Sequence, residues 1–159
     1  RVSCTRYGNV LGSRGSVIPL FQEQAKTGII TVTHLDMTRF WLTVEQGVEF
    51  VLECLDMMHG GEVFIPKLPS MRVVDVAQSI APDAEIRYIG VRPGEKLHVS
   101  LIASGEIAVD IGKCYIVKPA YEMWANPGPD EGTLMPSTWS YTSDTNERWL
   151  SKEEFLALI

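Results

Sequence analysis

Residues 29–66 read IITVTHLDMTRFWLTVEQGVEFVLECLDMMHGGEVFIP, and this stretch decides the fold class. Its first five residues are rich in β-branched side chains and predict a strand, and EVFIP at its end predicts another. Between them, Thr43 and Gln46 form a capping-box pattern, and Gly60-Gly61 ends the helix that follows. The apolar residues of this helix recur at helical spacing and fall on one face: Val44, Val48, Val51, Leu52, Leu55 and Met58. A helix between two strands indicates an α/β fold.

The segments on either side continue this alternation. Before it, VSCTRY (2–7) predicts a strand, a glycine-rich loop follows, and a helix runs from an N-cap at Ser16 to Gly28. After it we expect a helix in MRVVDVAQSIAP (71–82), a strand in EIRYIG (85–90) and a helix in KLHVSLIA (96–103). From Gly105 onward the sequence predicts an irregular C-terminal tail, residues 105–159, with one strand at 114–117.

Composition and charge are typical of a globular protein that binds small anions. With 159 residues, 45% of them hydrophobic and 21% charged, the chain is long enough to bury one core. The net charge of −6 argues against nucleic acid or an acidic membrane as a partner, because both need basic patches. Single arginines are instead dispersed through otherwise uncharged segments: Arg6, Arg14, Arg39, Arg72 and Arg92.

The cysteines and histidines predict buried thiols and no metal site. Cys4, Cys54 and Cys114 form no CxxC pair, which is typical of a protein in a reducing compartment. The histidines show no ligand spacing with them. No apolar run reaches the roughly 18 residues of a membrane span, and nothing resembles a signal peptide, so we expect a soluble stretch with no membrane contact. Because residues 2–7 already read as an interior strand, the sequence predicts a fragment of a longer protein.

The motif RPGEKLH (92–98) pairs Arg92 with Glu95 across a Pro-Gly turn. Pro93 fixes φ and Gly94 accepts a positive φ, so the turn is rigid and holds both side chains in set directions. A guanidinium suits phosphate oxygens, and a carboxylate can accept two hydrogen bonds from a vicinal diol. The turn therefore suits a ribose diphosphate. The alternative is an Arg–Glu surface pair beside a turn.

A glycine pattern near the start superficially matches a dinucleotide-binding fingerprint. Gly8, Gly12 and Gly15 lie between a strand and a helix, with Asp36 about twenty residues further on. Asn9 and Arg14 add polar bulk where a pyrophosphate needs close backbone approach, and a proline removes a donor near the helix start. The plain alternative is a tight strand-to-helix connection. We favour a substrate loop over both.

The chain contains no recognisable catalytic motif. No tyrosine has a lysine four residues on, as a short-chain dehydrogenase requires, and there is no G-x-S-x-G elbow, Walker loop or metalloprotease helix. By chemistry alone, the sequence predicts that this chain binds a ligand and supplies no catalytic residue.

Four motifs, in this order and at these intervals, closely resemble the C-terminal half of UDP-N-acetylglucosamine 4,6-dehydratases: RYGNVLGSRGSVIP (6–19), THLDMTRFW (33–41), LPSMRVVD (68–75) and VRPGEKLH (91–98). These enzymes are extended short-chain dehydrogenases of bacterial surface-polysaccharide and flagellin-glycan synthesis. WSYTSDTNERWL (139–150) is similar to the tail of the inverting branch, which starts the pseudaminic acid pathway. The resemblance therefore implies an α/β fold made of the last Rossmann strands and the substrate-binding lobe.

The resemblance also implies a function for the parent protein. Residues 1–159 would be the UDP-sugar-binding portion of one enzyme, with the NADP-binding half and the catalytic residues before Arg1. By resemblance, that enzyme would be a cytoplasmic lyase and a homo-oligomer. It would convert UDP-N-acetylglucosamine to a UDP-4-keto-6-deoxy sugar with inversion at C5. The fragment alone would be inactive. Two alternatives stay open: the retaining dehydratase branch, and a non-catalytic nucleotide-sugar-binding module.

The site residues follow from the same resemblance. Asn9 would contact the diphosphate or sugar, and the loop of Ser13, Arg14, Gly15 and Ser16 would close over them. The backbone of Tyr7 and Gly8 would pass near the nicotinamide. The remaining substrate residues fall in the later motifs. Thr31 to Thr33 would offer backbone groups to uracil, Arg39 and Arg92 would hold the diphosphate from opposite sides, and Glu95 would take the ribose hydroxyls. A bland alternative for Arg39 is a snorkelling arginine over an aromatic core.

Overall fold

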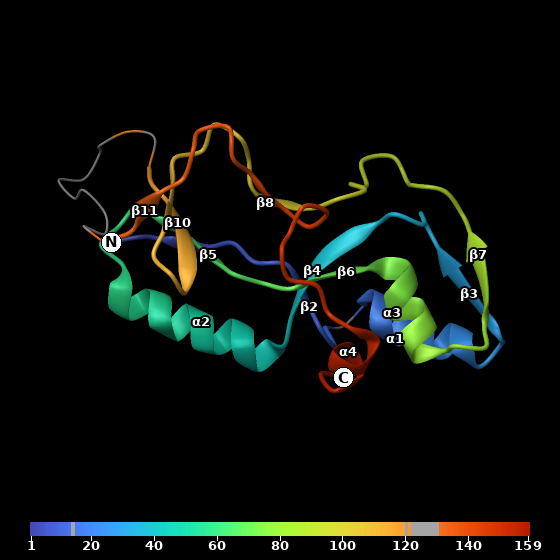
Figure 1. The fold of residues 1–159 in the computed structure, drawn as a ribbon. Coiled ribbons are helices and arrows are strands. Elements are labelled where there is room, and N and C mark those ends of the chain that lie inside the picture. Colours follow the sequence, from blue (N-terminus) through green and yellow to red (C-terminus); the bar gives the residue numbers. More distant parts are fainter. Residues whose placement is uncertain (14, 120, 122–130) are drawn as a thin grey trace. The chain divides into compact units, whose positions relative to one another are not determined.

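The computed structural model describes residues 1–13, 15–119, 121 and 131–159 (Figure 1). Helices are interleaved with strands up to residue 88, and further strands and a helix follow, so the α/β fold class is confirmed. The chain divides into two compact units, each assembled from separate stretches of sequence. The first unit contains Arg1–Tyr7, Glu45–Leu68 and Ser100–Thr142, and the second contains Gly8–Val44, Pro69–Val99 and Ser143–Ile159.

The first unit is built on a sheet of order β1-β5-β10-β9-β11, in which β1 and β5 are parallel and the other neighbours antiparallel. The bounds of these strands are Cys4–Thr5 (β1), Val63–Pro66 (β5), Ala108–Asp110 (β9), Cys114–Val117 (β10) and Thr133–Leu134 (β11). A separate antiparallel pair joins β8 (Ser100–Ile102) to β12 (Tyr141–Thr142). The predicted strands at 63–66 and 114–117 are therefore confirmed.

Helix α2 (Val44–Met57) packs through a different side from the one that the apolar spacing predicts. Its buried residues are Gly47 and Cys54, and Cys54 packs with Phe64 and Ile116. Four apolar residues of the predicted face are instead between 51% and 59% exposed: Val44, Val48, Leu52 and Leu55. Periodicity reveals how wide an apolar band is, but it does not say which edge of that band meets the sheet.

The second unit combines two small sheets with three helices. Strand β4 lies between β2, its parallel neighbour, and β6, its antiparallel one, while β3 pairs with β7 in parallel. The strand bounds are Asn9–Val10 (β2), Ile29–Val32 (β3), Thr38–Leu42 (β4), Ser70–Arg72 (β6) and Glu85–Tyr88 (β7). The helices are Val17–Ala25 (α1), Val73–Ile80 (α3) and Lys152–Leu156 (α4). The predicted strands at 29–33 and 85–90 and the helices after Ser16 and Met71 are confirmed.

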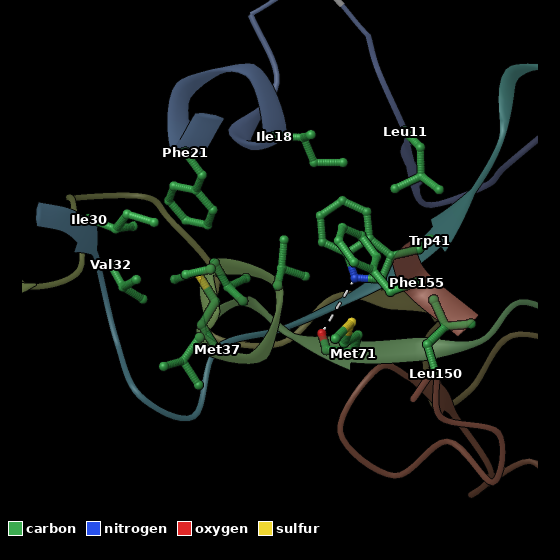
Figure 2. Packing of buried hydrophobic residues seen from close by; sticks show 14 residues of the cluster. Leu11, Ile18, Phe21, Ile30, Val32, Met37, Trp41, Met71, Leu150 and Phe155 are labelled. Carbon is green, nitrogen blue, oxygen red and sulfur yellow. Dashed lines mark hydrogen bonds between the residues drawn. The ribbon is translucent and has the colours of Figure 1, made fainter. Parts of the chain in front are cut away.

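Large apolar side chains form the core of the second unit (Figure 2). Trp41 of β4 is 1% exposed and meets Phe155 of α4 in an edge-to-face contact, with ring centroids 6.3 Å apart. Its indole N–H donates a hydrogen bond to the Met71 carbonyl, at 3.5 Å. Burying each such side chain contributes about 1.5–3 kcal/mol to folding. The last helix of the chain is thus part of this core.

The prediction for the last third of the chain is wrong in two places. Residues 96–103 were expected to be helical, but Ser100–Ile102 forms β8, because Tyr141–Thr142 pairs with it from about forty residues away. The described residues after Gly105 also hold more than the single expected strand, since β9, β11, β12 and α4 accompany β10. Tertiary pairing overrides local preference at these positions. Among the described residues, no helix has both the length and the apolar character needed to span a membrane.

Candidate functional site

A pocket of about 320 Å³ opens in the second unit, and every residue that lines it belongs to that unit. This volume lies at the lower end of the range of small-molecule sites, roughly 300–1,000 Å³. The pocket brings together residues that are up to 86 positions apart in sequence. Among those predicted as substrate contacts, it is lined by Asn9, Thr31, Thr33, Arg39, Arg92 and Glu95.

Asn9 reaches the pocket because β2 lies against β4. Asn9 is in register with Trp41, and the Leu11 N–H donates to the Leu42 carbonyl at 2.8 Å. The residue before it leaves no room for a side chain: a Cβ on Gly8 would lie 2.5 Å from the Phe40 Cβ. This close approach lets β2 and β4 pair, so packing alone explains the glycine at position 8.

Ser16, at the start of α1, lines the pocket, and it belongs to the loop that the resemblance predicts to close over the sugar and diphosphate. It occupies the N-cap position with extended backbone angles, but its side chain makes no capping hydrogen bond. Its hydroxyl oxygen is buried and has no hydrogen-bond partner among the described residues. Because a buried polar atom without a partner is costly, we interpret Ser16 as a ligand contact. The local pattern, which predicts a helix cap, is right about the position of Ser16 but not about its hydrogen bond.

Strand β3 has one edge that no strand of the second unit covers. Its other edge pairs with β7, where Ile89 N–H donates to the Val32 carbonyl at 3.0 Å. On the uncovered edge, the Thr31 N–H donates to Gln24 Oε1 at 3.0 Å, and Gln24 Nε2 donates to the Thr31 hydroxyl at 2.8 Å. Since the N–H and C=O of one strand residue point the same way, the Thr31 carbonyl also faces this edge.

Arg39 lies in the pocket wall with its guanidinium bound to backbone carbonyls. Nη1 donates to the carbonyls of Thr38 and Leu97, at 2.7 and 2.9 Å, and Nη2 donates to the Lys96 carbonyl at 2.8 Å. Desolvation by burial lowers the pKa of Arg39, and the nearby Glu95 carboxylate partly offsets this by raising it. The guanidinium therefore holds the segment after the RPGE turn and brings a positive charge to the pocket.

The turn that carries Arg92 and Glu95 closes on itself. Glu95 N–H donates to the Arg92 carbonyl at 3.0 Å, and Arg92 N–H donates to the Glu95 carboxylate at 3.2 Å. Gly94 has a φ of +81°, which a residue with a Cβ rarely adopts. Both side chains line the pocket, so it holds two guanidiniums and one carboxylate.

The other predicted site residues lie elsewhere. Ser13 donates its hydroxyl to the Val10 carbonyl at 2.9 Å and stays exposed in its loop, and Arg14 lies outside the described residues. Tyr7 is 38% exposed in the first unit. Neither Tyr7 nor Gly8 lines the pocket in the described part of the chain.

Two further arginines of the dispersed set have local partners instead. Arg6 pairs with Glu106 at 3.0 Å within the first unit, and Arg72 pairs with Asp75 at 2.8 Å. Across residues 1–13, 15–119, 121 and 131–159, no cluster of His, Cys, Asp and Glu is suited to hold a metal ion. The pocket chemistry therefore rests on the side chains described above.

Comparison with known proteins finds relatives that act on nucleotide sugars. Residues 1–119 match the model of a family described as polysaccharide biosynthesis protein. The UDP-N-acetylglucosamine 4,6-dehydratase (inverting) of Campylobacter jejuni is 40% identical to this chain, in an alignment that covers all of this chain and 51% of the dehydratase. A UDP-glucose 4-epimerase of Rickettsia bellii is 41% identical over 70% of this chain and 35% of the epimerase.

Among solved structures, the crystal structure of Pen from Bacillus thuringiensis matches 99% of this chain and 49% of its own, with a TM-score of 0.84 and 34% identity. The chain thus spans about half the length of the curated relatives that it matches over its whole length.

Proposed function

The chain belongs to the polysaccharide biosynthesis protein family, and we propose that its second unit binds UDP-N-acetylglucosamine as the substrate portion of a nucleotide-sugar 4,6-dehydratase. Its fold is that of the C-terminal half of an extended short-chain dehydrogenase. The observation that carries the proposal is the pocket in which Arg39, Arg92 and Glu95 meet the uncovered edge of β3. Both relatives described above are named for a UDP-hexose, which supports UDP as the nucleotide part of the ligand.

The two guanidiniums suit the diphosphate. Arg92 lines the pocket from the exposed turn, while Arg39 lines it from β4 and is fixed by the carbonyls of the 96–97 segment. A charge-assisted hydrogen bond to phosphate is about twice as strong as a neutral one. The unpartnered Ser16 hydroxyl and the Asn9 amide add polar contacts for the diphosphate or the sugar.

The nucleoside would be read by the edge of β3 and by Glu95. Uracil presents one N–H donor between two carbonyl acceptors, and the Thr31 carbonyl is an acceptor on an edge that no strand occupies. The Thr31 N–H already donates to the Gln24 side chain, so the base would bind the Thr31 carbonyl and polar groups of Thr33, which also lines the pocket. The Glu95 carboxylate can accept hydrogen bonds from both ribose hydroxyls.

The reaction itself would draw on residues outside this chain. NADP would supply reversible hydride chemistry to the proposed dehydration, in which C4 of the sugar would be oxidised, water would be lost across C5–C6, and C6 would then be reduced while C5 takes up a proton. The contact of Tyr7 and Gly8 with the nicotinamide, which the resemblance implies, stays a prediction. Within this proposal the chain would supply binding and orientation of the substrate.

Finer parts of the proposal rest on the resemblance. Inversion at C5, a role in pseudaminic acid or flagellin-glycan synthesis, a cytoplasmic location and a homo-oligomeric state all remain predictions. The retaining branch and a non-catalytic binding module are the alternatives. Both share UDP binding with the main proposal, so product analysis separates them.

The test uses the complete protein that carries these residues. Incubation with UDP-N-acetylglucosamine and NADP should yield a UDP-4-keto-6-deoxy sugar, whose C5 configuration NMR can assign. Isothermal titration should show UDP binding more tightly than GDP. Turnover with retained configuration would support the retaining branch, and UDP binding without turnover would support the binding module. Equal affinity for UDP and GDP would contradict the proposed site.

A further inference from the structure

We propose that residues 143–159, the C-terminal segment of the second unit, act as a positioning element for the nucleotide pocket. Ser143 would hold the segment that follows the Arg92–Glu95 turn, and Phe155 would hold Trp41, a residue of the pocket wall. None of the pocket-lining residues comes from the C-terminal segment itself. The inference rests on the proposed function and adds to it a part of the chain that does not touch the ligand.

Ser143 is fully buried and joins two segments that border the pocket. Its oxygen accepts a hydrogen bond from the Val99 N–H at 2.9 Å and lies 2.7 Å from the Thr38 hydroxyl. The Ser143 N–H donates to the Val99 carbonyl, also at 2.9 Å. Val99 is therefore bound to Ser143 through both of its backbone polar groups.

The same network continues toward the RPGE turn. The Thr38 hydroxyl lies 2.8 Å from His98 Nδ1, and the Thr38 N–H donates to the Leu97 carbonyl at 3.1 Å. Arg39 donates to that carbonyl as well. Residues 97–99, which follow the RPGE turn in sequence, are thus fixed on one side by β4 and on the other by Ser143. Buried polar networks of this kind specify one arrangement when every member has a partner.

A second contact reaches the pocket from the core. Phe155 is 0% exposed and packs edge-to-face against Trp41, and Trp41 is also a pocket-lining residue (Figure 2). Backbone hydrogen bonds hold the segment in place, since Leu150 N–H donates to the Ser70 carbonyl at 2.8 Å and Ser70 N–H donates to the Arg148 carbonyl at 2.9 Å. The C-terminal segment thus packs behind the wall of the pocket.

The family match gives this arrangement its significance. It covers residues 1–119 and so includes every residue that lines the pocket, but it ends before Ser143. The wall is thus made of family sequence, whereas the support behind the wall comes from outside the matched region. The Campylobacter jejuni dehydratase nevertheless matches the chain over its whole length, so the C-terminal segment is a support that this relative shares and the family model does not include.

The test is a double-mutant cycle in the complete protein, with UDP as the titrant in calorimetry. Ser143→Ala removes the hydroxyl contacts to Val99 and Thr38 and should weaken UDP binding by roughly three- to tenfold, about the net worth of one hydrogen bond, because its effect on the ligand is indirect. If Ser143 positions Glu95, Glu95→Gln should cost less in the Ser143→Ala background than in the wild type. If Ser143 has a purely structural role, the loss of UDP affinity in the double variant should equal the product of the losses in the two single variants.

Controls separate positioning from stability. Ser79→Ala also removes a buried hydroxyl from the second unit, one that donates to the Asp75 carbonyl of its own helix at 2.7 Å, and it should leave UDP affinity unchanged. Phe155→Leu tests the second contact if Ser143→Ala does not fold. Unchanged UDP affinity in Ser143→Ala, or multiplicative losses in the double variant, would overturn this inference and leave the proposed function intact. Absence of UDP binding by the wild type would instead remove the proposed function.

Discussion

Arg39 donates a hydrogen bond to the carbonyl of Leu97 at 2.9 Å, although 58 residues separate the two in sequence. This bond, with those to Thr38 and Lys96, makes one guanidinium both a structural clamp and a source of positive charge in the pocket. Arg92, by contrast, sits on the exposed turn and lines the pocket from there. The two arginines of the proposed diphosphate site therefore differ in what their removal does.

Arg39→Ala and Arg92→Ala should each weaken UDP binding, because a charge-assisted contact to a largely desolvated diphosphate is worth roughly 1.5–3 kcal/mol. Only Arg39→Ala should also lower the free energy of unfolding, since it removes three hydrogen bonds from the guanidinium to backbone carbonyls. Calorimetry with UDP and urea denaturation measure the two effects. Lys26→Ala is the control, because Lys26 is exposed and pairs with Glu23 on the surface. Equal UDP affinity in all three variants would remove both arginines from the site.

Gly8→Ala should destabilise the fold by roughly 1–3 kcal/mol, because the added Cβ would lie 2.5 Å from the Phe40 Cβ and 2.6 Å from the Phe40 carbonyl oxygen. Relief requires β2 to move away from β4, which would also displace Asn9. Urea denaturation measures the cost. A Gly8→Ala variant as stable as the wild type would show that β2 and β4 are not in close contact.

Glu62 should contribute stability that is lost in acid. Burial raises the pKa of this carboxyl, but hydrogen bonds from Ser3, at 2.6 Å, and from the N–H groups of Gly60 and His59 outweigh it and lower the pKa overall. The folded state therefore binds the proton less tightly than the unfolded state does. The stabilisation is present above the unfolded pKa, about 4.3, and disappears as the pH falls through the lower folded pKa.

Comparison of the wild type with Glu62→Gln tests this. The variant should be less stable at neutral pH by roughly 1–3 kcal/mol, the cost of weakening a buried hydrogen-bonded group. The difference in the free energy of unfolding between the wild type and Glu62→Gln should narrow as the pH falls below about 4. A gap of constant size across this range would show that the pKa of Glu62 is not lowered by folding.

The thiols should react in two classes. Burial raises the pKa of Cys54 to about 12 and that of Cys114 to about 11, so neither forms much thiolate at neutral pH. Cys4 is exposed in β1. We expect one fast-reacting thiol with a maleimide or a disulfide reagent at about pH 8. Cys4→Ser should abolish the fast phase, and its persistence in that variant would mean that one of the other two cysteines opens to solvent.

Local sequence pattern predicts many of the helices and strands of the second unit, but it does not predict contacts between residues that are distant in sequence. The strands at 29–32 and 85–88 and the helix at 73–80 follow from β-branched runs and helical spacing. Residues 100–102 were misread as helix because their strand partner, β12, is distant in sequence. For Ser16 the local pattern predicts a cap and the resemblance predicts a place in the substrate loop, because local pattern alone cannot show whether a serine bonds its own helix or faces a pocket.

Glu95 gives the sharpest test of the proposed nucleotide site, since its role depends on the ribose hydroxyls. Its carboxylate accepts from the Arg92 N–H at 3.2 Å and still has acceptor capacity toward the pocket. If it binds both hydroxyls, the wild type should prefer UDP over its 2′-deoxy analogue by roughly 1–2 kcal/mol. Glu95→Gln should keep the fold and show a smaller preference, because an amide offers only one oxygen acceptor.

Four titrations, of the two proteins with the two nucleotides, isolate the contact from general destabilisation. The alternative, in which Glu95 serves only its own turn, predicts that both proteins discriminate the two nucleotides equally. Arg72, a neighbouring cation that might have paired with Glu95, is already bound to Asp75 through two hydrogen bonds, at 2.8 and 3.1 Å. Equal discrimination would therefore leave Glu95 as a capping residue and Arg92 as the ligand contact of this turn.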